Sequence, residues 1–302
     1  MNILNHTLAT IVLAVAVMNS ASAKLAIFAC EPEWGALAQE LGGDQVEIYT
    51  ATTALQDPHQ IQARPSLIAH ARKADLMICS GAELETGWLP QVQRQSGNSK
   101  IQVNGAGYFE ASSVVQRLEV PTVVDRSQGD VHPGGNPHIQ TDPHNIAAVA
   151  TALIARMRAL DAAQADYYQQ RYRDFDQRWT TAIAGWEAAA APLNGMTIVT
   201  HHKYWVYLLQ WLKLQEIATL EPKPGVPANV THLAEILTTL HQTPARCILR
   251  TPYDDPQPSQ WLAERAAVPA IVLPGSVGGL PGTDTLFGLF DVTIAELLKT
   301  VR

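Results

Sequence analysis

A long stretch without proline, from Asp161 to Ala191, constrains the fold of this chain more than any other feature. Its alanine, glutamine and arginine content favours a helix, and Pro192 marks the end. At 1.5 Å per residue this helix would be about 45 Å long, enough to reach from one lobe to another. Its large apolar residues form one broad stripe, which suits packing against two lobes better than the narrow seam of a coiled coil. They are Tyr167, Tyr168, Tyr172, Phe175, Trp179, Ile183 and Trp186.

Strands and helices alternate on both sides of this stretch. Before it, predicted strands cover 25–30, 46–50, 75–79, 101–103 and 120–124, and predicted helices cover 34–41, 65–74 and 145–160. After it, predicted strands cover 197–200, 216–220, 247–250 and 271–273, and predicted helices cover 205–213, 231–241, 257–266 and 285–301. Short links between strand and helix are typical of right-handed parallel units.

The fold prediction is therefore an α/β protein of two lobes, each with a parallel sheet flanked by helices. One long spine helix joins the lobes, and the ligand site lies in the cleft between them, because ligands bind outside the carboxyl ends of parallel strands. We expect a signal peptide at 1–23, an N-terminal lobe at 24–160, the connecting helix at 161–191 and a C-terminal lobe at 192–302.

The first 23 residues carry a targeting signal. An apolar run from Leu8 to Met18 precedes small residues that end at Ala23, which predicts cleavage after that residue. The run of about 11 residues is shorter than the roughly 20 that span a bilayer. Because no cysteine lies in this segment, we expect a periplasmic protein that is secreted through its signal peptide and is not a lipoprotein.

Three cysteines remain after cleavage, at positions 30, 79 and 247. Each lies in or at the end of an apolar strand-like run, which favours buried free cysteines. A bridge between Cys30 and Cys79 is the alternative if their strands are neighbours. The net charge of −7 and the lack of a basic stripe exclude nucleic acid as a partner and favour a cation.

Histidines occur where predicted strands end. His59 follows the second strand, His138 lies in the loop 130–143 that is rich in glycine and proline, and the pair His201 and His202 closes the first strand of the second lobe. Asp284 ends a glycine-rich loop just before the last helix. Any one of these alone would more simply be a solvated side chain or a helix cap. Their placement at four strand ends, two in each lobe, favours a shared site.

Three imidazoles with one carboxylate suit Zn²⁺, whereas manganese sites usually carry more oxygen. The predicted ligands are His59, His138, His202 and Asp284, with His132 and His201 as secondary candidates. For the fourth position, Asp291 and the pair Asp254 and Asp255 remain alternatives. Solvated faces or caps are expected for the other histidines of predicted helices, which are His70, His144, His232 and His241.

Motifs over nearly the whole mature chain resemble one family, the bacterial metal-binding proteins that feed zinc or manganese ABC importers, and its zinc-uptake periplasmic members in particular. The motifs are 57–66, 74–85, 135–138 with 142–143, 202–207, 220–225, and 277–279 leading to Asp284. The family pattern of a histidine followed by aromatics favours His202, followed by Trp205 and Tyr207, over His201. Many zinc members carry a long loop rich in histidine and aspartate. The corresponding segment of this chain, 126–132, is short, so it departs from that pattern.

The resemblance implies a periplasmic solute-binding protein, not an enzyme, that captures Zn²⁺ and delivers it to an ABC permease in the inner membrane. It also implies a rigid spine with modest lobe movement, and it allows for a periplasmic metallochaperone as a further partner. We expect a monomer. The alternatives are a manganese importer component and a zinc-dependent hydrolase, although the chain lacks a His-Glu-x-x-His helix and a glutamate base beside its ligand motifs.

Overall fold

The protein is described by a computed structural model that covers residues 23–123, 125, 129 and 131–301. The signal peptide predicted for 1–23 thus lies outside the described residues, apart from Ala23. Within the described ranges, no helix combines the length and apolar character needed to cross a membrane.

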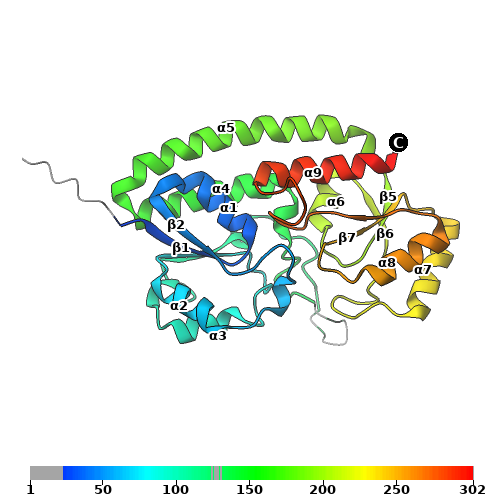
Figure 1. The fold of residues 1–302 in the computed structure, drawn as a ribbon, viewed down its shortest axis with the longest axis horizontal. Coiled ribbons are helices and arrows are strands. Elements are labelled where there is room, and N and C mark those ends of the chain that lie inside the picture. The colour runs from blue at the N-terminus through cyan, green and yellow to red at the C-terminus, as the bar shows by residue number, and fades with distance from the viewer. Residues whose placement is uncertain (1–22, 124, 126–128, 130, 302) are drawn as a thin grey trace, which may run out of the picture.

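Two parallel sheets of four strands form the frame of the molecule (Figure 1). The first has the order β2-β1-β3-β4 and the second the order β6-β5-β7-β8. The strands are β1 (Leu25–Ala29), β2 (Val46–Thr50), β3 (Leu76–Cys79), β4 (Tyr108–Glu110), β5 (Thr197–Thr200), β6 (Gln215–Thr219), β7 (Cys247–Arg250) and β8 (Ala270–Val272). The two sheets share one topology, and the predicted fold class is confirmed.

Helices cover both sheets, and several begin with a proline at the first turn, where its missing N–H costs nothing and its fixed φ suits the helix. They are α1 (Pro32–Gly42), α2 (Pro65–Lys73), α3 (Leu89–Ser96), α4 (Pro143–Leu160), α5 (Ala165–Ala190), α6 (Val206–Leu212), α7 (Val230–Gln242), α8 (Pro256–Ala266) and α9 (Leu286–Leu298). Of these, α3 was not predicted.

The long helix α5 lies along both lobes (Figure 1). Its aromatic stripe is buried, with Tyr168, Phe175, Trp179 and Trp186 among the core residues. The indole N–H of Trp179 donates to the Pro143 carbonyl at the start of α4 (2.9 Å), and that of Trp186 donates to Asp291 on α9 (2.7 Å). One continuous hydrophobic cluster includes residues of both sheets, so the lobes share a core across α5.

The fourth strand of the first sheet differs from the prediction. Neither 101–103 nor the described part of 120–124 is a strand, and β4 lies between them. Ile101 is buried at the end of a short 3₁₀ turn, whereas Val103 is exposed. A side chain at Gly107 would come within 2.2 Å of the Asp75 carbonyl, so this glycine lets β4 lie beside β3. Ile101 and Val103 therefore belong to a turn in which only Ile101 is buried, and they do not form a strand.

A disulfide joins Cys30 and Cys79, which corrects our expectation of free cysteines. The strand order places β1 beside β3, so Cys30, which follows β1, meets Cys79, the last residue of β3. Cys247 is buried and free, as expected.

Candidate metal site

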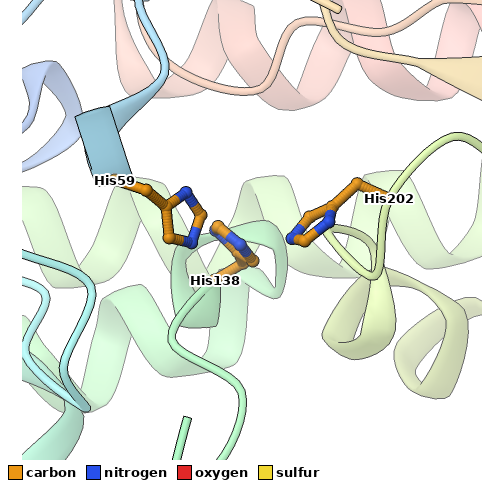
Figure 2. A group of neighbouring side chains, drawn as sticks. All are labelled: His59, His138 and His202. Atoms are coloured by element: carbon orange, nitrogen blue, oxygen red, sulfur yellow. The ribbon is translucent and has the colours of Figure 1, made fainter. Parts of the chain in front are cut away.

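Three histidine rings converge between the lobes (Figure 2). His59 lies in a short turn after β2, His138 in the loop before α4, and His202 directly after β5. One ring nitrogen from each lies within 4.8 Å of the others. The ring centroids are 5.4 to 5.7 Å apart and the planes are steeply inclined, so each pair of rings is T-shaped.

Carboxylates orient two of the rings. The Nδ1 atom of His59 lies 2.7 Å from Asp57, and the Nδ1 atom of His202 lies 2.6 Å from Glu221. Such pairing fixes the tautomer and leaves Nε2 for an ion, which is the usual arrangement around metal-binding histidines. Burial lowers the pKa of His202, but the hydrogen bond and charge of Glu221 outweigh it, and the pKa is raised above its usual 6.5.

His138 has the opposite electrostatic setting. Its side chain is fully buried and stacks on Tyr204 with ring centroids 4.1 Å apart. Burial, followed by the charges of His59 and His202, lowers its pKa well below 6.5. Neither ring nitrogen has a hydrogen-bond partner among the described residues. Burying a neutral imidazole whose nitrogen atoms have no hydrogen-bond partner costs free energy unless a bound ligand contacts one of them.

The loop around His138 is held by contacts to the second lobe. Asn136 accepts a hydrogen bond from the His138 backbone N–H (3.1 Å) and donates to the Lys203 carbonyl (2.7 Å). The Tyr207 hydroxyl donates to the Asn136 carbonyl (2.7 Å). Gly135 has φ +95°, and a side chain there would approach the Leu118 carbonyl at 2.8 Å. Glycine at this position therefore allows the turn that aims His138 across the cleft.

The other predicted ligands lie outside this group of three. His132 is nearest, with its Nε2 atom 3.2 Å from that of His59. His201 is buried beside His202, and its Nδ1 atom has no partner in the described chain. Asp284 is exposed and is not gathered with the histidines. It does not cap α9 either, because Thr285 accepts the Gly288 N–H as the N-cap.

Acidic groups surround the histidines. One pocket is lined by Asp57, Glu221 and Asp254 together with His59 and His202. In the sequence, Asp57 and Glu221 were noted only as members of the motifs 57–66 and 220–225, and their contacts with the imidazoles were not predicted. The signal available was their position, since each lies in a loop that follows a strand at the same edge as a ligand histidine.

Comparison with known proteins identifies relatives along the chain. The sequence model of the family described as "ZnuA: Zinc-uptake complex component A periplasmic" matches residues 27–300. The manganese ABC transporter substrate-binding lipoprotein PsaA of Streptococcus pneumoniae is 21% identical over 257 residues, or 83% of this chain and 79% of PsaA. The metal ABC transporter substrate-binding lipoprotein FimA of Streptococcus parasanguinis is 22% identical over 261 residues, or 83% and 80% of the two chains.

Among solved structures, the crystal structure of ZnuA is similar with a TM-score of 0.75 at 17% identity, covering 91% of this chain and 98% of the other. This likeness shows a shared fold. The names of the relatives contradict one prediction. PsaA and FimA are lipoproteins, so our expectation of a protein without a lipid anchor is wrong. Its only basis was the lack of cysteine in residues 1–23, which does not outweigh these relatives.

Proposed function

The chain belongs to the ZnuA family of zinc-uptake components, and from that premise we propose that it captures Zn²⁺ with His59, His138 and His202 for delivery to a membrane permease. Members of this family are metal-binding substrate-binding proteins of ABC importers. The observation that carries the choice of zinc is the converging group of three imidazoles, in which no carboxylate is included.

The donor set favours zinc over manganese. Imidazole nitrogen suits Zn²⁺, whereas Mn²⁺ prefers carboxylate and carbonyl oxygen. In a tetrahedral zinc site the Zn–N distance of about 2.0–2.1 Å places the nitrogens roughly 3.3 Å apart. The three nitrogens already lie within 4.8 Å of one another, so small ring rotations close the site. Water fills the remaining position in this proposal.

An open fourth position is also the layout of a zinc hydrolase, but the nearby carboxylates support transport. Asp57 is engaged with the His59 ring, and Glu221 with the His202 ring and the Gly225 N–H. Each of these carboxylates holds a ligand ring in place, and neither belongs to the group of three imidazoles at which an attacking water would be activated. The three ligands come from one chain, so the proposed working unit is a monomer that hands its ion to the permease. A metallochaperone remains a further proposed partner.

Metal competition tests the proposal. Metal-free protein is equilibrated with equal, limiting concentrations of Zn²⁺ and Mn²⁺, and its metal content is measured by elemental analysis after gel filtration. We expect zinc to be retained almost alone, and preferential retention of manganese would overturn the assignment.

Alanine variants test the ligands. Replacing His59, His138 or His202 removes one of three donors, and each change should weaken zinc binding by about 100-fold or more in a chelator competition. His144→Ala is the matched control, because His144 is exposed and pairs with Asp142 and Glu187 and is not in the group of three histidines. Asp284→Ala should likewise leave binding unchanged. Unaltered affinity in the three site variants would exclude this location.

A further inference from the structure

A second group of metal-binding side chains lies next to the three histidines. The pocket that shares His59 and His202 with the first site is also lined by His201, Asp254, Asp57 and Glu221. His138 is not among its lining residues. The pocket, which Asp255 also lines, therefore combines an additional imidazole with four carboxylates and borders the proposed zinc site on one side.

His201 is the residue that the first site leaves unexplained. Only 8% of it is exposed, and its Nδ1 atom has no hydrogen-bond partner in the described ranges of the chain. Its backbone is fixed, because its N–H donates to the Leu249 carbonyl (2.8 Å) and its own carbonyl accepts the Glu221 N–H (3.1 Å). A buried imidazole with a fixed backbone and an unused nitrogen is suited to receive a ligand.

The carboxylates around it retain binding capacity. Asp254 uses Oδ2 to accept the Thr251 N–H (2.7 Å), and this bond leaves Oδ1. Asp57 contacts the His59 ring through Oδ1, and Glu221 contacts the His202 ring through Oε2, so each has a second oxygen outside those bonds. Together with Asp255, these carboxylates place four acidic groups around a pocket that also holds His201, and they attract a cation and repel an anion.

We propose that this pocket is a second binding site for a divalent cation of the borderline class, ligated by His201 and Asp254 with help from the outer oxygens of Asp57 and Glu221. This inference rests on the proposed capture of zinc at the three histidines. The second site holds an incoming ion, and the ion passes to the first site along the carboxylates that orient His59 and His202.

The second site is the weaker of the two. In the described part of the chain, the three histidines are gathered within 4.8 Å, but His201 and Asp254 are not part of such a group. Water must therefore supply more of the ligands of the ion at the second site, and this ion exchanges more readily. Repulsion between two dications in adjacent sites lowers the second affinity further once the first is filled.

Calorimetric titration of the metal-free full chain with Zn²⁺ tests the inference. We expect a tight phase of one ion followed by a weaker phase of one ion. His201→Ala and Asp254→Asn should each weaken the second phase by about 10-fold or more while the tight phase is kept. His144→Ala should retain both phases. Zinc-edge anomalous diffraction should then place the second ion beside His201 and Asp254.

Three outcomes would overturn the second site. They are a single phase in the unaltered protein, a weak phase that neither substitution changes, and loss of the tight phase in His201→Ala, which would make His201 a ligand of the first site. By contrast, a tight phase that persists when His59, His138 or His202 is replaced contradicts the proposed function and not this inference, so the two failures are distinguishable.

Discussion

The carboxyl group of Glu33, at the start of α1, accepts a hydrogen bond from the hydroxyl of Ser276, which lies 243 positions further along the chain in the loop after β8. Both residues are buried, and the bond ties the first lobe to the second. Burial raises the pKa of Glu33 from 4.5 to about 7, although the bond from Ser276 lowers it. Burial likewise raises the pKa of Glu85 to about 7. Burial thus favours the protonated form of Glu33, between the lobes, and of Glu85, within the first lobe.

Replacing Glu33 by glutamine should change how stability depends on pH. Since the folded pKa lies above the unfolded value, the unaltered protein loses stability as pH rises from about 4.5 to about 7 and stays at the lower level above that. Glu33→Gln removes this loss and can still accept the Ser276 bond. At pH 8 the variant should be more stable by on the order of 3 kcal/mol, with little difference at pH 4.5. Urea unfolding at both pH values measures this.

The exposed residue Glu264 supplies the control for that experiment, because Glu264→Gln should shift both unfolding curves equally and slightly. A Glu33→Gln variant that follows the pH dependence of the unaltered protein would show that Glu33 titrates normally.

The carboxylates that hold the histidine rings should contribute to zinc affinity without touching the first ion. Asp57→Asn and Glu221→Gln keep a hydrogen-bond acceptor but remove the charge, and Glu221→Ala removes both. We expect affinity to fall by about 10-fold or more for the amides and further for alanine, as measured by chelator competition. Glu235→Gln, at an exposed position of α7, is the control. Equal affinity in all variants would mean that the rings need no such orientation.

Zinc binding should release protons near neutral pH. His138 is already neutral because its pKa is lowered, whereas His202 retains a proton to higher pH because its pKa is raised. An ion that binds His202 must displace that proton, so affinity falls as pH drops through the raised pKa. Calorimetry at pH 7 in buffers of different ionisation enthalpy measures the release. Glu221→Gln should reduce it, and heats independent of buffer would contradict the assignment.

The Cys30–Cys79 disulfide should stabilise the first lobe. It closes a loop with a sequence separation of 49, for which the chain-entropy model gives roughly 4 kcal/mol. The variants Cys30→Ala, Cys79→Ala and the double replacement should therefore lose similar amounts, because each removes the same bond. Thermal unfolding without reductant measures this. Additive losses would show that the two cysteines act independently.

Much of the fold follows from local patterns. The alternation of apolar strand-like runs with helical patterns placed β2, β7 and most helices within one or two residues, and the proline-free stretch predicted α5. The pairing of β1 with β3 is set by long-range packing. From the sequence, the Cys30–Cys79 disulfide was therefore only the alternative to free cysteines. The short strand β4 has only three residues, which follow Gly107, and the more apolar segments 101–103 and 120–123 on either side of it form no strand.

The site was predictable to a similar extent. His59 and His202 lie in loops after β2 and β5, and His138 lies in the loop before α4; the carboxyl ends of parallel strands are where such ligand-binding loops are expected. Asp284 also lies in a loop after a strand, β8, but it is exposed just before α9 and is not gathered with the histidines. The contact of Glu221 with His202 depends on how the loop after β6 lies against the loop after β5. The residues next to Glu221 in the sequence do not determine that arrangement.

The two indole hydrogen bonds of α5, from Trp179 to the α4 side and from Trp186 to α9, have a thermodynamic consequence. Neither lobe can lose its structure without exposing residues of the hydrophobic cluster that both lobes share. Despite its two sheets, the protein should therefore melt in one cooperative transition, with equal calorimetric and van 't Hoff enthalpies. An ion bound between the lobes would then raise the melting temperature of the whole chain at once.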